Sequence, residues 1–132
     1  MANNGVMPLR SEQDIVSARQ AVRKWCVELG FSLVDQTKMV TAASELARNT
    51  LIYGGGGEMQ WAAGPDGGRR ALTLTFADEG PGIPDLELAM TDRWTSGNGL
   101  GLGLSGARRL VQEFGIESAP GAGTRVTISR WK

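Results

Sequence analysis

Glu45 and Asn49 are the first residues in this sequence whose types and spacing could do chemistry. Residues four apart on a helix share a face, so we expect the two side chains to project side by side. An amide oxygen beside a carboxylate suits a Mg²⁺ ion whose remaining ligands are phosphates and water. A Glu on a helix is usually a solvated surface group. Asn49 is the more informative residue, because Asn is a mediocre choice inside a helix.

The run Asp78-Glu79-Gly80-Pro81-Gly82 directly follows an apolar strand pattern. In isolation it is typical of a turn that ends a strand. The functional interpretation places the Asp78 carboxylate at a cleft, where it accepts a hydrogen bond from the amino group of adenine. Gly80 and Gly82 would then let the backbone approach the ligand closely. Guanine carries a carbonyl at that position, so the pattern favours ATP over GTP.

A third candidate is the glycine-rich segment 97–103, with the sequence GNGLGLG, which runs into an apolar helix pattern. It is not a Walker A motif, because no Gly-Lys-Ser/Thr follows, and it does not match the Rossmann fingerprint. Free backbone amides at the start of a helix nevertheless bind anions. A flexible linker is the alternative, although alternating leucines are unusual in a solvated linker.

The composition limits what these motifs can do. The 132 residues fit one domain, and 14 basic residues balance 14 acidic ones, which argues against a nucleic-acid binder. The sequence has no histidine, which excludes a Ser-His-Asp triad, a histidine-ligated metal and a phosphohistidine on this chain. Cys26 lies in a helical pattern and is expected to be a buried, inert thiol. No signal peptide or membrane-spanning run is recognisable, so we expect a cytoplasmic protein without a membrane partner.

The elements that would position the motifs follow from periodicity. A capping box at Ser11 and Asp14 predicts a helix that ends near Gly30. A second helix is expected from an N-cap at Asp35 to Tyr53. Its predicted core stripe consists of Met39, Ala42, Ala43, Leu46 and Thr50.

The rest of the chain predicts a hairpin, a loop, a helix and a strand. The hairpin joins a strand at 58–63 through a turn at 64–68 to a strand with Leu72, Leu74 and Phe76 on one face. A short helical piece at 86–90 and a mobile loop at 91–103 follow. A helix from Leu104 would bury Ala107, Leu110, Val111 and Phe114, and a last strand would bury Val126 and Ile128. This order predicts an α/β sandwich (α+β) with a mixed, mainly antiparallel sheet covered on one face by helices.

Taken in order, the motifs resemble the N, G1, G2 and G3 boxes of the GHKL ATPases, the superfamily of gyrase, Hsp90, histidine kinases and MutL. The resemblance implies the Bergerat ATP-binding fold over residues 1–132, with ATP and Mg²⁺ as cofactors. The matching residues are Glu45 and Asn49, then Asp78, Gly80 and Gly82, then Gly99, Gly101 and Gly103, and finally Gly123 and Thr124.

The resemblance also implies a role for each of these residues. Asn49 would hold Mg²⁺ against the phosphates, and Asp78 would fix adenine, with the Thr124 hydroxyl nearby. Glu45 would be catalytic, orienting and partly deprotonating the attacking hydroxyl. The remaining expected nucleotide contacts are Gly80 and Gly82, together with the lid segment Gly99, Leu100, Gly101, Leu102, Gly103 and Leu104.

Further runs, DIVSARQ from Asp14, SELARN from Ser44, GPGIPD from Gly80 and the closing Gly-Thr…Trp, are similar to the RsbT-type serine/threonine switch kinases of the stressosome. This similarity implies a kinase that phosphorylates STAS-domain proteins and, after release, activates a PP2C-type phosphatase. Two alternatives stay open. One is an anti-sigma factor kinase of the RsbW or SpoIIAB type, which would bind a sigma factor, and the other is a nucleotide-sensing adaptor without catalysis.

Overall fold

The structure is a computed structural model that describes residues 3–66, 69–83 and 100–132. Three helices and five strands alternate irregularly along these residues. In chain order they are β1 (Asn4–Leu9), α1 (Glu12–Glu28), α2 (Leu33–Ile52), β2 (Gly57–Asp66), β3 (Arg69–Asp78), α4 (Leu100–Arg109), β4 (Glu113–Ser118) and β5 (Thr124–Trp131).

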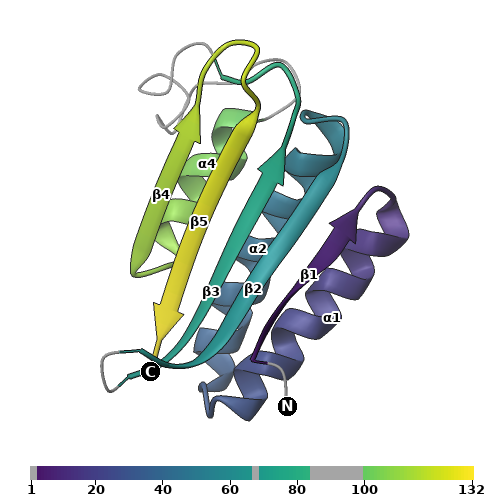
Figure 1. The fold of residues 1–132 in the computed structure, drawn as a ribbon. Helices are drawn as coiled ribbons and strands as arrows, with labels where there is room; N and C mark the ends of the chain where they lie inside the picture. Colours follow the sequence, from purple (N-terminus) through teal and green to yellow (C-terminus); the bar gives the residue numbers. More distant parts are fainter. Residues whose placement is uncertain (1–2, 67–68, 84–99) are drawn as a thin grey trace.

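The five strands form one sheet in the order β1-β2-β3-β5-β4. Every pairing among the described strands is antiparallel, and β5, the last strand in the chain, lies between β3 and β4. The described helices all cover the same face of the sheet (Figure 1). This confirms the predicted α/β sandwich. The prediction was a mixed, mainly antiparallel sheet, and the pairs among the described strands are all antiparallel.

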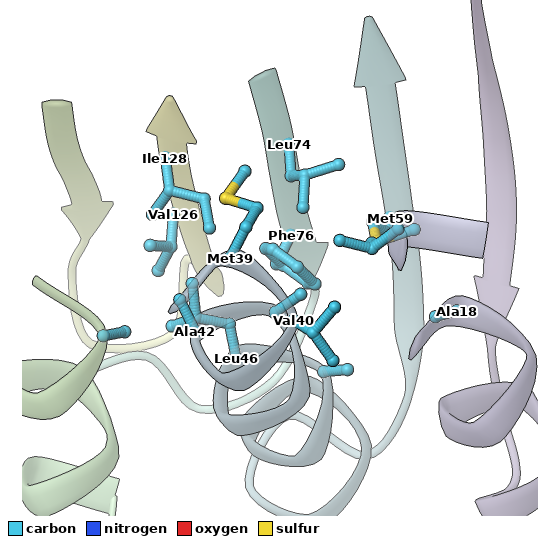
Figure 2. Packing of buried hydrophobic residues seen from close by; sticks show 14 of the residues in the cluster. Ala18, Met39, Val40, Ala42, Leu46, Met59, Leu74, Phe76, Val126 and Ile128 are labelled. Carbon is cyan, nitrogen blue, oxygen red and sulfur yellow. The ribbon is translucent and has the colours of Figure 1, made fainter. Parts of the chain in front are cut away.

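The core lies between this face and the helices, and α2 runs along its centre. The predicted α2 stripe is confirmed, because Met39, Ala42, Ala43, Leu46 and Thr50 are all buried. Figure 2 shows α2 side chains meeting apolar residues of β2, β3 and β5. The strand residues concerned are Met59, Leu74, Phe76, Val126 and Ile128, all buried as their period of two requires.

Serine hydroxyls cap both long helices. The Ser11 hydroxyl accepts the Asp14 amide at 3.2 Å, as the predicted capping box requires. The second cap differs from the prediction, because Ser32 is the N-cap of α2 and its hydroxyl accepts the amide of Asp35 at 3.1 Å. Asp35 instead lies in the first turn, where a carboxylate also favours the positive end of the helix dipole.

The sequence interpretation missed two strands and misplaced both ends of one helix. β1 contains Gly5 and Pro8 and therefore lacks a strand signal; Pro8 is tolerated because β1 is at the edge of the sheet. The predicted helix from Leu104 begins at Leu100 instead and ends at Arg109. Phe114, predicted to be on that helix, is on β4. The expected helical piece at 86–90 and the loop residues 91–99 lie outside the described residues.

Cys26 is on α1, lies in the hydrophobic core of the protein and has no exposed surface. Burial raises the pKa of its thiol to about 11. The predicted burial is therefore confirmed, and the low reactivity of the thiol stays a prediction.

Candidate functional site

A small cavity lies where β3 ends and β5 begins, beneath α2 and α4. Its volume is about 20 Å³, enough for about one water molecule. A nucleobase is several times larger, so a base would have to enlarge the cavity or bind at its opening. The lining residues are Leu46, Asn49, Thr50, Tyr53, Phe76, Asp78, Leu104, Thr124 and Val126. Four residues predicted from separate motifs, Asn49, Asp78, Leu104 and Thr124, are thus brought together.

Helical periodicity brings Asn49 to this cavity. Leu46, Asn49, Thr50 and Tyr53 follow the spacing of one helix face, and all four line the cavity. The Asn49 side-chain nitrogen is buried and has no hydrogen-bond partner in the protein. A buried polar atom left unpaired costs about 1–3 kcal/mol, so this nitrogen favours a hydrogen-bonding ligand or a water molecule in the cavity. The nitrogen and oxygen of an amide are assigned rather than observed, so either atom could face that ligand.

Asp78 reaches the cavity from the last position of β3. Antiparallel pairing places it opposite Thr124, the first residue of β5. One Asp78 carboxylate oxygen, Oδ1, accepts the Gly80 amide at 2.9 Å. Burial raises the pKa of the Asp78 carboxyl above its ordinary value, and the backbone amides of Gly80 and Thr124 offset only part of that rise. A carboxylate kept in a cavity at such a cost is typical of a binding site.

Ser118 joins the site, and the sequence motifs did not single it out. Its hydroxyl oxygen lies 2.8 Å from each of three atoms, which are the Ile83 amide nitrogen, the Gly123 carbonyl oxygen and the Thr124 hydroxyl oxygen. It therefore connects the loop after β3 to the start of β5. A lone serine at the end of a short strand carries no distinctive spacing, so no pattern in the sequence could have found it.

The glycines of this region make room for protein backbone. A Cβ atom on Gly80 would meet the backbone of Gly54, and one on Gly82 would overlap the Ala119 carbonyl. Gly82 also has a φ of +77°, which L side chains rarely adopt. Gly54, at the end of α2, is a further residue that the site needs, because a Cβ there would overlap the Asp78 carboxyl. The expected contact of Gly80 and Gly82 with a nucleotide stays a prediction.

Glu45 does not line the cavity. It is exposed on α2, one turn before Asn49, on the neighbouring part of the helix surface. The structure thus places it close to the cavity along the helix but not in its wall. Its catalytic role stays a prediction.

The predicted lid segment is described in part. Leu104 is buried and lines the cavity. Leu100, Gly101, Leu102 and Gly103 form the first turn of α4 rather than a loop. The first amides of a helix have no partner within it, so this turn can still present backbone donors to an anion. Gly99 lies outside the described residues.

A larger cleft of about 710 Å³ also includes Asp78 and Thr124 in its lining. Its other walls carry charges of both signs, including Arg10, Glu58 and Arg125. The Arg125 guanidinium is already bonded to the Gln60 side chain at 3.2 Å. We assign the site to the small cavity, because that is where the unpaired Asn49 amide lies.

Two properties of the described residues bear on metals and membranes. They include no group of three or more His, Cys, Asp or Glu side chains that could hold a metal ion. A Mg²⁺ ion at Asn49 would therefore need most of its ligands from phosphates and water, which is usual for this ion. No helix in this part of the chain has the length and apolar character needed to cross a membrane.

The antiparallel sheet with helices on one face, and the cavity that joins Asn49, Asp78 and Thr124, define a class of protein. The chain belongs to the family described as histidine kinase-, DNA gyrase B-, and HSP90-like ATPases, which matches residues 34–132. One particular relative is the serine/threonine-protein kinase RsbT of Bacillus subtilis (strain 168). It is 41% identical over 131 residues, and the match covers 99% of this chain and 98% of RsbT.

Other relatives lie further away. The anti-sigma F factor of Thermoanaerobacter sp. (strain X514) is 29% identical over 129 residues, which are 93% of this chain and 89% of that protein. Among solved structures, the RsbU and RsbW domains of Rv1364c from Mycobacterium tuberculosis superpose with a TM-score of 0.64 at 19% identity. That match covers 98% of this chain but only 33% of the Mycobacterium chain, and at this identity it shows the fold alone.

Proposed function

We propose that this chain binds ATP in the Asn49–Asp78–Thr124 cavity and transfers its γ-phosphate to a serine or threonine of a STAS-domain protein. The observation that carries the proposal is the convergence of these three polar residues, from α2, β3 and β5, on one cavity with an unpaired amide. Relatives named as a serine/threonine kinase and as anti-sigma factors support a partner-switching kinase.

Asp78 and Thr124 would hold the base. They are directly opposite each other on β3 and β5, so their side chains lie on the same face of the sheet, about 5 Å apart at Cβ. The Asp78 Oδ1 atom is occupied by the Gly80 amide. The Thr124 backbone amide also bonds to this carboxylate. Two carboxylate oxygens can accept about four hydrogen bonds, so the carboxylate keeps capacity to accept the amino group of adenine.

Asn49 fits the role of a Mg²⁺ ligand in the nucleotide complex. Its side-chain nitrogen is buried and has no hydrogen-bond partner in the protein. The nitrogen and oxygen of an amide are assigned rather than observed, so the oxygen, a ligand type that Mg²⁺ accepts, can take this position. When bound, the ion would neutralise charge on the phosphates. The first turn of α4 would supply backbone amides to the same phosphates.

Glu45 would orient the acceptor hydroxyl. It is exposed and one helical turn from Asn49, so an incoming protein can reach it without entering the cavity. Phosphoryl transfer proceeds through a loose transition state, in which positioning matters more than a strong base. An exposed carboxylate is therefore sufficient.

The proposed partners are STAS-domain substrates and, after release from them, a PP2C-type phosphatase. We also propose that the chain acts in the cytoplasm. It would act as a single domain, because all described strands belong to one sheet over one core. Neither nucleic acid nor membrane is among the proposed partners.

The direct test is to incubate the purified chain with γ-labelled ATP, Mg²⁺ and the STAS-domain proteins of the same genome. We expect label on one serine or threonine, mapped by mass spectrometry and lost when that residue is changed to alanine. Release of labelled phosphate with no labelled protein would contradict the kinase and leave an ATPase. Absence of both would leave the nucleotide-sensing adaptor.

A second candidate function is favoured by the anti-sigma F factors among the relatives, one of which is 33% identical over 122 residues. An anti-sigma kinase would bind an RNA polymerase sigma subunit as well as its substrate. Co-purification with each sigma factor of the genome, with and without ATP, separates the two functions. Specific ATP-dependent retention of one sigma factor would favour the anti-sigma candidate.

A further inference from the structure

The hydrogen bonds of the Ser118 hydroxyl determine whether the Thr124 hydroxyl can act as a donor or as an acceptor toward the cavity. Ser118 Oγ has three partners, each at 2.8 Å, but it carries only one proton. The Ile83 amide can only donate, and the Gly123 carbonyl can only accept. Two oxygens 2.8 Å apart without a proton between them would repel each other.

Only one arrangement places a proton in every contact. Ser118 donates to the Gly123 carbonyl and accepts from the Ile83 amide with one lone pair. Its other lone pair must then accept the Thr124 hydroxyl proton. The Thr124 hydroxyl proton is therefore engaged in the bond to Ser118. Toward the cavity, the Thr124 oxygen can act only as an acceptor.

The neighbouring group on the cavity wall is an acceptor as well. Asp78 is the direct cross-strand neighbour of Thr124, and its carboxylate accepts rather than donates when ionised. Two acceptors side by side suit an exocyclic amino group, which has two N–H bonds on one atom. They repel a carbonyl oxygen, the group that hypoxanthine and guanine carry at the same position of the ring.

We propose that Ser118 is a specificity-determining positioning residue, which fixes Thr124 as a hydrogen-bond acceptor and so makes the cavity select 6-aminopurines over 6-oxopurines. Ser118 would act through Thr124 without touching the base. This inference rests on the proposed ATP site and adds to it the device that rejects inosine and guanine nucleotides. The ionised Asp78 carboxylate accepts with both oxygens, and the bonded Thr124 hydroxyl cannot turn its proton into the cavity.

The test compares the dissociation constants of ATP and ITP, measured by calorimetry with Mg²⁺ present, for the wild type and for Ser118→Ala. In the variant, the Thr124 hydroxyl is no longer bonded to Ser118 and can donate into the cavity. This should strengthen ITP binding, because the ITP carbonyl gains a donor, and weaken ATP binding, because the ATP amino group loses an acceptor. One hydrogen bond corresponds to about a 2- to 13-fold change in affinity. We therefore expect the dissociation constant of ITP divided by that of ATP to fall by about 2- to 13-fold or more.

Two matched variants control the comparison. Ser118→Thr keeps the hydroxyl and should restore the wild-type ratio. Thr127→Val removes a hydroxyl from the same strand on the opposite face, where Thr127 bonds Thr75 at 3.1 Å, and should leave the ratio unchanged. A purely structural loss in Ser118→Ala would weaken both nucleotides equally, so an unchanged ratio would overturn the proposal.

A measurement on the unaltered protein covers the case in which Ser118→Ala does not fold. Replacing one amino hydrogen of ATP by a methyl group removes one of the two donors. The wild type should bind N6-methyl-ATP and ITP more weakly than ATP, and equal binding of all three would also overturn the proposal. Failure of the wild type to bind ATP at all would instead overturn the proposed function itself.

Discussion

The backbone amide of Gly80 donates a 2.9 Å hydrogen bond to the carboxylate of Asp78, two residues before it in the chain. This bond and the Thr124 amide favour the charged carboxylate, but burial outweighs them and the pKa of Asp78 stays raised. The charged form of Asp78 is therefore less favourable in the folded protein than in the unfolded chain. A ligand that donates hydrogen bonds to Asp78 would relieve that cost.

Replacing Asp78 with asparagine should separate binding from stability. Asp78→Asn should lose a charge-assisted hydrogen bond to adenine worth about 1.5–3 kcal/mol, a 10- to 150-fold loss of ATP affinity. The fold should not suffer, because the amide oxygen can still accept the Gly80 amide. Calorimetry and thermal unfolding measure the two effects. Glu79→Gln, which removes the neighbouring exposed charge, is the matched control, and equal losses in both variants would contradict a specific contact.

The raised pKa of Asp78 predicts a direction for the pH dependence of stability. Between its ordinary value of 3.8 and its raised value, the native carboxyl binds more protons than the unfolded one. Stability from this group therefore falls as pH rises through that interval, and at neutral pH Asp78 is a net cost. Urea unfolding of wild type and Asp78→Asn from pH 3.5 upward should show the variant gaining relative to the wild type. A difference that moves in the opposite direction would mean that the carboxyl is stabilised in its charged form.

Asn49 should show a similar conflict between stability and binding. Asn49→Leu keeps a similar shape and removes the unpaired amide, so the protein without ligand should gain about 1 kcal/mol. ATP binding should lose its dependence on Mg²⁺, measured by titration with and without the ion. Asn49→Ala should lose the same dependence without the gain in packing. An unchanged response to Mg²⁺ in both variants would remove Asn49 from the list of metal ligands.

Glu45 variants should bind ATP normally and transfer phosphate slowly. Glu45 is exposed and does not line the cavity, so Glu45→Gln and Glu45→Ala should leave ATP affinity nearly unchanged. Transfer should fall about 10²- to 10⁴-fold, the usual contribution of a general base. Single-turnover transfer at saturating ATP measures this without interference from product release. Glu28→Gln, an exposed carboxylate on α1, is the control, and wild-type transfer in the Glu45 variants would make Glu45 an ordinary surface residue.

Cys26 should report global unfolding. With a pKa of about 11, only about one thiol in a thousand is ionised at pH 8, and the side chain has no exposed surface. We expect alkylation of the native protein to proceed at the rate at which the fold opens, and to become fast in urea. Rapid alkylation of the native state would show that α1 detaches from the sheet on its own.

The sequence predicted the elements that carry a strong period. α1, α2 and the hairpin of β2 and β3 have repeating apolar residues over many positions, and glycine or serine marks their ends. β1 has no such pattern, because Gly5 and Pro8 are both poor strand residues, and Pro8 is tolerated only because β1 is at the edge of the sheet. Phe114 fits a helical spacing with Ala107 and Leu110, so β4 could not be distinguished from a longer helix. The segment is a strand because it pairs with β5, and this long-range contact cannot be read from the local sequence.

The candidate site was predictable where a residue type is unusual for its position. Asn49 inside a helix and Asp78 at the end of an apolar strand are residues of this kind, and both line the cavity. Ser118 and Gly54 are not unusual where they stand, and their importance lies in atoms contributed by distant residues. The Gly54 backbone meets Asp78, and the Ser118 hydroxyl meets Thr124, only after the sheet has formed.

The position of β5 in the sheet has a consequence for protein synthesis. β5 leaves the ribosome after the four other strands of the described residues, yet it lies between β3 and β4. Until it emerges, β4 has no neighbour and the edge of β3 is open, so the nascent chain presents an unpaired strand to any chaperone or aggregating partner. Thr124 also arrives with β5, so the Asp78–Thr124 pair forms only then. Nucleotide would therefore be unable to assist folding during translation and could stabilise only the chain in which the last strand has been inserted.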